Sequence, residues 1–544
     1  MQRIITFPQT TNSLNDQTTN LPNDQTMIVK TFSAALNGLE VSIVTVEAFS
    51  TTGSFYHLTG LGDAAVKESH DRIFAALTSI GKMPKTAEYT INLAPADLKK
   101  EGSGFDLPVA MSLLSLNGHV EKDAIKDYLF LGELSLDGSI QPIKGALPIA
   151  IEARKRNFAG MIVPKENERE AAVVNNLPIY GVSHITEVID FMNGNQRNLQ
   201  PAFVDTRKEF CEEEVRFDVD FEDVKGQEVV KRAMEVAAAG GHNMIMVGPP
   251  GSGKSMMAKR LPTILPPLTL AESLETTQIY SIAGMLPTST TGGSPLMTRR
   301  PFRSPHHTIS QVALCGGGIV ARPGEISLAH NGILFADELP EFNKKTLEVM
   351  RQPLEDHKVT ISRATYNIDY PCNFMFVAAM NPCPCGYYND PTHDCNCTPG
   401  QIKRYLGKIS GPLLDRIDLQ VECSNVKFND LAKLQPGEPS RDIRSRVVAA
   451  REIQTKRFAN DQGVYCNAQM TEKLIHKYAE PTPDAMEVLK TAMEKFNLSA
   501  RAYSRILKVA RTIADLDNSE TVEKRHIQEA VLYRSLDRSY WGEW

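Results

Sequence analysis

The sequence predicts a multidomain α/β protein, and three patterns along the chain point to that fold class. Between residues 27 and 195, apolar runs of strand length alternate with runs of helical spacing. From 217 to 423, several apolar runs of strand length end in polar residues, and helix-prone segments lie between them. From 424 to 544 the spacing is helical, with few strand signals. We therefore expect an α/β N-terminal domain, an α/β core and a C-terminal helical domain.

Within the N-terminal domain, six segments have a clear expected state. The expected strands are Val41–Val46, Tyr89–Leu93 and Gly160–Val163, and the expected helices are Asp63–Ile80, Leu107–Leu116 and Ile143–Arg156. Residues 1–26 are rich in Thr, Asn, Gln and Asp and predict a disordered tail, so Met27 is a second candidate start. Residues 196–216 carry mixed charge without periodicity, which is typical of a linker.

The bulk composition excludes several classes of protein. The 544 residues suggest about three domains, because a domain usually spans about 100–200 residues. No apolar run approaches the ~20 residues of a membrane helix, and no signal peptide opens the chain, so we expect a cytoplasmic protein without a membrane partner. The net charge of −6 gives no overall basic surface, so contacts with nucleic acid must be local.

A glycine-rich loop follows the apolar run Met244–Val247 and precedes the helix-prone Met256–Lys259. Such a loop wraps backbone N–H groups around a polyphosphate, and the next helix points its positive end at it. We expect Lys254 to reach the β- and γ-phosphates and Ser255 to hold Mg²⁺, with ATP as the nucleotide. The pattern is G-x-x-x-x-G-K-[ST], and its residues are Gly248, Pro249, Pro250, Gly251, Ser252, Gly253, Lys254 and Ser255.

Two later strands end in polar residues that would complete a hydrolysis site. Gly332–Ala336 leads into Asp337 and Glu338, and Phe374–Met380 leads into Asn381. We expect Asp337 to position Mg²⁺ through water and Glu338 to orient and polarise the attacking water. Asn381 can touch the γ-phosphate or that water. An Asp-Glu pair alone is a common strand end, but the phosphate loop upstream favours catalysis.

The order of these elements resembles that of the AAA+ ATPases, with a parallel-sheet core and a helical lid. More closely, the chain from about 28 to 540 resembles the YifB/ComM family of magnesium-chelatase-like AAA+ proteins. The segments that carry this resemblance are Asp223–Gln227, Ala238–Asn243, Phe302–His307 and Gly411–Asp418.

The resemblance assigns roles to two arginines. Arg416 matches the arginine finger that enters the site of a neighbouring subunit; the alternative is a surface arginine paired with Asp415 or Asp418. Arg501 matches the lid arginine that contacts nucleotide in the same chain, with Arg505 as its nearest competitor. A finger that acts between subunits requires a ring, so the resemblance implies a homohexamer.

Four of the nine cysteines cluster just after the polar tip at Asn381. Four thiolates suit tetrahedral Zn²⁺, and we expect a structural zinc because four protein ligands leave no open position. The alternative is four reduced thiols in a loop, and His393 could replace one cysteine. The cluster consists of Cys383, Cys385, Cys395 and Cys397.

Basic side chains in two segments, 299–307 and 358–370, are candidate DNA contacts. Related proteins direct such segments into a central pore, where they would meet backbone phosphates without sequence preference. The alternatives are a solvated loop, or contact of His306 and His307 with a neighbouring subunit. The candidates are Arg299, Arg300, Arg303, Lys358 and Arg363. A weaker basic stripe, more typical of a solvated helix face, consists of Arg441, Arg444, Arg446, Arg451, Lys456 and Arg457.

The N-terminal domain resembles the proteolytic domain of Lon-type proteases, which use a Ser-Lys dyad. Ser103 lies near the serine position, but the lysine position falls at Leu147, and Lys144 is three residues away. We therefore expect a non-proteolytic scaffold. The segments that carry this resemblance are Lys100–Gly104, Leu131–Gly138 and Pro164–Asn167.

Together these features favour an ATP-driven hexameric DNA motor. The family resemblance implies helicase or translocase work that promotes branch migration during DNA uptake and integration. The alternative is a chelatase-type motor that remodels a protein partner during metal insertion. An ATP-dependent protease is a third possibility, which Leu147 opposes.

Overall fold

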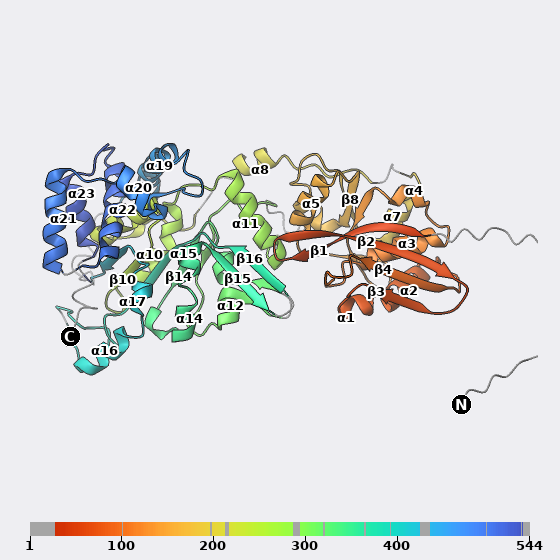
Figure 1. Cartoon of the computed structure of the whole chain (residues 1–544), viewed down its shortest axis with the longest axis horizontal. Helices are drawn as coiled ribbons and strands as arrows, with labels where there is room; N and C mark the ends of the chain where they lie inside the picture. Colours follow the sequence, from red (N-terminus) through yellow and green to blue (C-terminus); the bar gives the residue numbers. More distant parts are fainter. Residues whose placement is uncertain are drawn as a thin grey trace, which may run out of the picture.

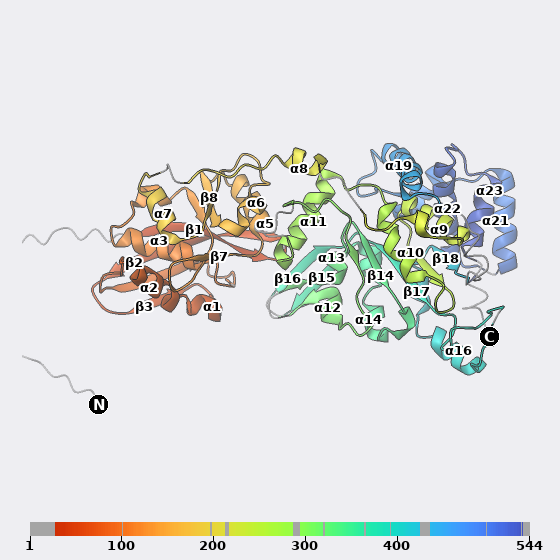
Figure 2. The same cartoon turned by 180° about the vertical axis from the view of Figure 1, so that it is seen from behind.

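The computed structural model arranges the chain as three units in a row (Figures 1 and 2). The N-terminal α/β unit lies at one end, the second α/β unit in the middle and the C-terminal helices at the other end. The expected tail, 1–26, lies outside the described residues. These are 28–100, 102–195, 199–212, 217–286, 294–318, 321–363, 366–391, 393–424, 436–496, 498–534 and 536.

A mixed seven-stranded sheet in the order β3-β4-β2-β1-β5-β8-β9 forms the N-terminal unit. Apolar side chains cover both of its faces and form two buried clusters, so helices pack on both sides. The strands are β1 (Val29–Asn37), β2 (Glu40–Thr51), β3 (Tyr56–Thr59), β4 (Glu88–Ala94), β5 (Tyr128–Phe130), β8 (Gly160–Pro164) and β9 (Ile179–Val182), with a separate pair β6 (Glu133–Leu134) and β7 (Ile140–Gln141). The helices are α1 (Ala64–Lys67), α2 (Ser69–Ser79), α3 (Asp106–Leu116), α4 (Lys122–Ile125), α5 (Ala146–Lys155), α6 (Glu168–Ala171), α7 (Ile185–Met192) and α8 (Thr206–Glu212).

The segments expected in this domain form, with two differences. The helix expected over Asp63–Ile80 is divided into α1 and α2. Residues 199–212 are not a free linker: the Ala202 N–H donates to the Ile179 carbonyl at 2.8 Å, and Thr206 donates to the Val173 carbonyl at 2.8 Å. The described part of the expected linker therefore packs on the N-terminal unit.

A five-stranded, fully parallel sheet in the order β11-β14-β17-β10-β18 forms the middle unit. Strands β10, β14 and β17 are buried along their whole length, as expected for parallel strands covered on both faces. The strands are β10 (Met244–Val247), β11 (Phe302–Arg303), β14 (Ile333–Ala336), β17 (Met375–Met380) and β18 (Leu419–Glu422). This arrangement confirms the expected α/β core with a parallel sheet.

Helices and two hairpins surround this sheet. The hairpin predicted over 358–370 forms, and pairs Lys358 with Pro371 at its base. The hairpin strands are β12 (Gly316–Gly317), β13 (Arg322–Pro323), β15 (Lys358–Arg363) and β16 (Tyr366–Pro371). The helices are α9 (Glu228–Gly240), α10 (Lys254–Arg260), α11 (Leu270–Ala283), α12 (Gln311–Cys315), α13 (Glu325–Leu328), α14 (Lys344–Glu348), α15 (Pro353–Asp356), α16 (Pro399–Leu406) and α17 (Gly411–Leu414).

The C-terminal unit is helical, as the sequence predicts. Its apolar side chains join those of α9 and of one face of the parallel sheet in a single buried cluster, so this unit packs directly on the core. Its helices are α19 (Ser440–Arg457), α20 (Glu472–Tyr478), α21 (Pro483–Phe496), α22 (Ala500–Leu516) and α23 (Lys524–Leu532).

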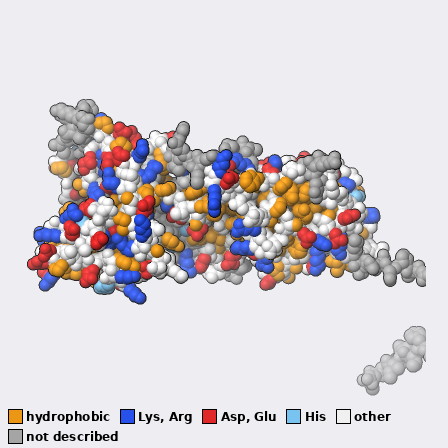
Figure 3. Space-filling model, turned by 90° about the horizontal axis from the view of Figure 1, so that it is seen from above, with side chains coloured by type: hydrophobic (Ala, Val, Ile, Leu, Met, Phe, Trp, Pro, Cys, Tyr) orange, Lys and Arg blue, Asp and Glu red, His pale blue; other side chains and the backbone are white. Residues whose placement is uncertain are grey.

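Figure 3 shows the molecule from above. Hydrophobic side chains gather over the half that carries the N-terminal unit, whereas positive and negative side chains are interspersed elsewhere. This face has no continuous basic band among the residues drawn in colour. In the described part of the chain, no helix combines the length and the apolar character that crossing a membrane requires.

Candidate active site

The glycine-rich loop lies at the carboxyl end of β10 and leads into α10. Gly251 and Gly253 have φ values of 81° and 83°, which side chains with a Cβ rarely adopt. Lys254 Nζ donates to the carbonyls of Gly248 and Pro249 at 2.7 and 2.8 Å and to Asn381 Oδ1 at 3.2 Å. Burial lowers the pKa of this lysine, and the nearby acidic groups oppose that shift. The ammonium group is therefore held at the centre of the loop.

Two acidic residues follow β14 at the same edge of the sheet. Ser255 Oγ donates to Asp337 Oδ2 at 2.6 Å, which places the two predicted magnesium ligands side by side. Glu338 has φ 51° and ψ 49°, in the left-handed region. Non-glycine residues held there are strained, and such strain is frequent at active sites. The structure thus brings together the loop, Ser255, Asp337, Glu338 and Asn381, where parallel α/β sheets bind ligands.

His307 also lies at this edge, although its sequence context suggested only contact with a neighbouring subunit, as one alternative, for this residue. Its Nδ1 atom lies 3.4 Å from Glu338 Oε2. The pairing of β11 with β14 brings the two segments together. Only the order of the strands, which places β11 beside β14, brings His307 to this site, and the sequence pattern does not reveal that order.

The two arginines singled out by family resemblance lie at the opposite, amino edge of the sheet. They line a cavity of about 410 Å³ together with residues that immediately precede the strands. A four-residue strand such as β10 is roughly 13 Å long, so the thickness of the sheet separates this cavity from the phosphate loop. The lining includes Asn243, Gly332, Phe374, Arg416, Asp418 and Arg501.

Both arginines are paired within the chain. Arg416 donates to the Pro412 carbonyl at 2.6 Å and contacts the Glu355 carboxylate, and its side chain is 18% exposed. Arg501 donates to Asp415 at 2.7 Å, and its side chain is 68% exposed. The helix places Arg501 at the edge away from the phosphate loop of its own chain, which does not favour the expected contact with nucleotide in the same chain. Arg505, the competitor, pairs with Asp418 at 3.3 Å and lies at the same edge.

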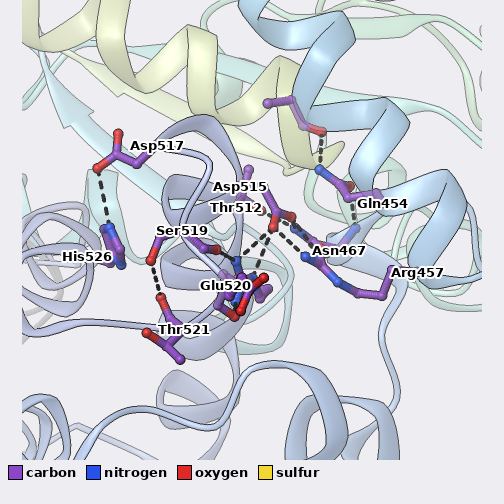
Figure 4. A network of polar contacts seen from close by, with 12 residues as sticks. Gln454, Arg457, Asn467, Thr512, Asp515, Asp517, Ser519, Glu520, Thr521 and His526 are labelled. Atoms are coloured by element: carbon purple, nitrogen blue, oxygen red, sulfur yellow. Dashed lines mark hydrogen bonds and ion pairs between the residues drawn. The ribbon is translucent and has the colours of Figure 1, made fainter.

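A buried polar network surrounds α22, the helix that carries Arg501 and Arg505 (Figure 4). The fully buried Asp515 carboxylate accepts hydrogen bonds from Arg457 at 2.5 and 2.7 Å and from Arg511 at 3.1 Å. Gln454 donates to the Ala239 carbonyl near the end of α9 at 3.0 Å. Since breaking one partner of a buried ion pair is costly, the ion pairs hold α22 on α19 within the C-terminal unit. The Gln454 bond and the contact of Thr512 with His242 at 2.8 Å join this unit to the core.

The four clustered cysteines lie beside the phosphate loop. Their sulfur atoms are all within 4.8 Å of one another, with separations of 3.3, 3.7 and 3.6 Å among those of Cys383, Cys385 and Cys395. Zn–S bonds of about 2.3 Å in a tetrahedron place sulfur atoms about 3.8 Å apart, so the cluster fits zinc. The thiols are Cys383, Cys385, Cys395 and Cys397. His393, the possible substitute ligand, stacks on Tyr387 instead, with ring centroids 4.8 Å apart.

Comparisons with known proteins cover nearly the whole chain. Three family models match: "Magnesium chelatase, subunit ChlI" over residues 220–431, "Subunit ChlI of Mg-chelatase" over 44–167 and "Magnesium chelatase, subunit ChlI C-terminal" over 437–534. Protein YifB of Escherichia coli is 40% identical over 503 residues, which cover 92% of this chain and 96% of that protein. Competence protein ComM of Haemophilus influenzae is 39% identical over 513 residues, 93% of this chain and 97% of that protein.

The chain belongs to the YifB/ComM family of magnesium-chelatase-like AAA+ ATPases. A shorter stretch of 103 residues, 19% of this chain and 22% of the relative, is 35% identical to DNA repair protein RadA of Aquifex aeolicus. Family membership accounts for the nucleotide loop, the parallel sheet and the helical C-terminal unit, and it indicates ATP and Mg²⁺ as cofactors.

Two of the candidate DNA contacts in this AAA+ core, Arg300 and Arg303, form ion pairs within the chain. Arg300 pairs with Glu272 at 3.1 Å and donates to the Pro266 carbonyl at 2.6 Å, and its side chain is 16% exposed. Arg303 forms two 2.6 Å hydrogen bonds with Glu325. Their guanidinium groups hold β11 in place, so the structure favours an anchoring role for these two residues, and their contact with DNA stays a prediction.

The other candidate DNA contacts are more accessible. Arg299 is exposed and lies over the Phe217 ring at 5.9 Å. Lys358 is half exposed and pairs with Asp369 at 3.1 Å across the hairpin. The side chain of Arg363 lies outside the described residues. In the basic stripe of α19, Arg446 and Arg457 form ion pairs within the chain, which favours a structural role for these two residues.

The protease-like positions of the N-terminal unit serve packing. Ser103 contacts the carboxylate of Glu133 rather than a lysine, and Leu147 is fully buried in α5. Lys144 lies just before α5, which begins at Ala146 and not at Ile143 as expected. The aliphatic part of its side chain packs against Gly284. This segment therefore docks the N-terminal unit on the core.

Proposed function

We propose that this chain is an ATP-driven DNA motor that works as a homohexameric ring and promotes branch migration of recombination intermediates during DNA uptake and integration. The observation that carries the ring is the division of the ATPase site. The phosphate loop and acidic residues occupy the carboxyl edge of the sheet, whereas Arg416 and Arg501 occupy the amino edge. One chain presents the cradle and its neighbour presents both arginines.

Each side chain then has a defined task in hydrolysis. Lys254 exchanges its loop carbonyls for phosphate oxygens, while Ser255 and Asp337 hold Mg²⁺, which neutralises charge on the phosphates. Glu338 orients the attacking water, and the neighbour's guanidinium groups stabilise the charge that develops on the γ-phosphate. Arg416 must first exchange its contact with Glu355 for the incoming phosphate.

Two observations support DNA as the partner. Relatives over the full chain and over a short stretch are named for competence and for DNA repair. The β15–β16 hairpin carries the exposed Lys358, where a basic side chain can meet a backbone phosphate. No base-specific reading is required, because phosphate contacts supply sequence-independent affinity.

The test is ATP turnover with branched DNA, single-stranded DNA or no DNA. Branched DNA is expected to raise turnover, and the effect is expected to weaken between about 50 and 200 mM salt as phosphate contacts are screened. Lys358→Ala should reduce the stimulation, whereas Lys490→Ala, on the exposed side of the lid helix α21, should not. Turnover that no DNA changes would refute the DNA motor.

That refuting outcome would favour the second candidate, a chelatase-type motor that remodels a protein partner during metal insertion. The specific observation in its favour is that all three matching family models describe a magnesium chelatase subunit. Such a motor would share the divided ATPase site but would respond to a protein rather than to DNA.

We further propose that the four clustered cysteines hold one structural Zn²⁺. Cys383 is fully buried beside the core, and the turn that follows packs on the phosphate loop: a Cβ on Gly386 would lie 2.6 Å from Pro250 Cδ. A metal bound by these cysteines would therefore stabilise the phosphate loop through the turn that packs against Pro250.

Metal analysis of the purified protein tests this assignment. We expect about one zinc per chain, lost in Cys385→Ser and Cys397→Ser and kept in Cys315→Ser, a free thiol outside the cluster. Losing the metal should weaken binding of a fluorescent ATP analogue by about tenfold or more, because the loop loses its support. Protein from zinc-supplied medium that contains no metal would show that the thiols are merely neighbours.

A further inference from the structure

His307 lies where it can control the water-orienting carboxylate. Its Nδ1 atom is 3.4 Å from Glu338 Oε2. Its ring contacts the tilted ring of His306, with centroids 4.1 Å apart, and forms an edge contact with Phe342 at 6.5 Å. The imidazole is therefore held from two sides, and its side chain is 30% exposed.

The pairing of β11 with β14 places His307 and Glu338 side by side. Arg303 at the end of β11 pairs in register with Leu334 in β14. His307 and Glu338 each follow four residues after this pair. The ion pair between Arg303 and Glu325 anchors β11, so the approach of His307 is set by the core rather than by a free loop.

Glu338 needs such a partner. Its side chain is 59% exposed, and His307 is the only side chain within ion-pairing distance of its carboxylate among the residues that the structure describes. An exposed glutamate samples several rotamers, and only some of them direct an oxygen at the attacking water. Positioned groups contribute to catalysis only when their rotamer is held.

We propose that His307 is a positioning residue for Glu338. With its proton on Nδ1, the imidazole donates to Oε2 and leaves Oε1 to accept from the attacking water. Catalytic contacts of this kind are often long without substrate and tighten when it binds. This assignment rests on the proposed ATPase function, but it concerns a residue that does not touch the nucleotide.

Steady-state ATP hydrolysis of three variants tests the proposal. His307→Ala is expected to lower kcat by at least about tenfold, a part of what a positioned general base supplies, with KM for ATP changed by less than about twofold. His307→Asn is expected to recover much of the loss, because its amide N–H can lie where Nδ1 does. His306→Ala removes one of the two rings that hold the imidazole but not the contact with Glu338, so it should lower turnover clearly less than His307→Ala does.

A double variant separates positioning from general loss of structure. If the two residues act as a unit, His307→Ala should have little further effect in the Glu338→Gln background. Normal turnover in His307→Ala, or equal losses in His306→Ala, would overturn the proposal while leaving the ATPase assignment intact. Normal turnover in Glu338→Gln would instead overturn the assignment of Glu338 itself. ATP-analogue binding confirms that each variant is folded.

Discussion

Replacing Glu338 by Gln is expected to lower ATP turnover by about 100-fold or more while ATP still binds. Gln keeps the size of the side chain but cannot polarise a water molecule as a carboxylate does. The phosphate loop, Lys254 and the Ser255–Asp337 pair do not depend on this side chain, so nucleotide affinity should change by less than about threefold.

The measurement compares turnover with the affinity for a non-hydrolysable ATP analogue. Glu341→Gln is the matched control, because Glu341 is three residues away and pairs with Lys408 at 3.2 Å instead of facing the phosphate loop. Its turnover should stay near that of the unmodified protein. If Glu338→Gln hydrolyses ATP at the normal rate, another residue orients the water.

The sequence predicts the phosphate side of this site well because each of its parts follows a strand. Buried apolar runs identify β10, β14 and β17, and the carboxyl ends of parallel strands meet at one edge. The loop and the tips at Asp337 and Asn381 could therefore be assigned before the strand order was known. Lys254 and Asn381 follow different strands, and the hydrogen bond between them shows that the two strand ends meet at this edge.

The basic residues were harder to assign because charge alone does not reveal a partner. Arg300 pairs with Glu272, which is 28 positions away in the sequence, and Arg303 pairs with Glu325, which is 22 positions away. Neither pairing has a local sequence signal. The sequence therefore suggested two phosphate contacts where the structure has two anchors for β11.

The sequence also could not predict at which edge of the sheet Arg501 lies. Helical spacing predicts α22 and its exposed face, but not the packing of that helix on the core. The contact of Thr512 with His242 at 2.8 Å and the bond from Gln454 to the Ala239 carbonyl at 3.0 Å fix this packing. They place Arg501 beside Arg416, and both arginines therefore belong to the amino edge.

The second major prediction concerns how two inactive variants behave when mixed. Lys254→Ala cannot hold the phosphates, and Arg416→Ala cannot supply the arginine finger, so each variant alone should lose most of its turnover. An arginine finger raises kcat by about 10³–10⁵-fold. In a ring with head-to-tail contacts, a random 1:1 mixture gives both intact parts to about one interface in four. Mixing should therefore restore hydrolysis.

The same design distinguishes the roles of the two arginines. If both act from the same neighbouring chain, Arg416→Ala mixed with Arg501→Ala should restore nothing, because no interface then receives both. Arg441→Ala, an exposed arginine of α19, is the control for loss of charge and should stay active without mixing.

The most direct test of the divided site is ATP turnover in mixtures of Lys254→Ala and Arg501→Ala. If Arg501 acts on the nucleotide of its neighbour, mixed rings should hydrolyse ATP faster than either variant alone, with a maximum near about a quarter of the normal rate at equal amounts. If no ratio exceeds the single variants, although each still assembles, Arg501 serves its own chain and the assignment of the amino edge is wrong.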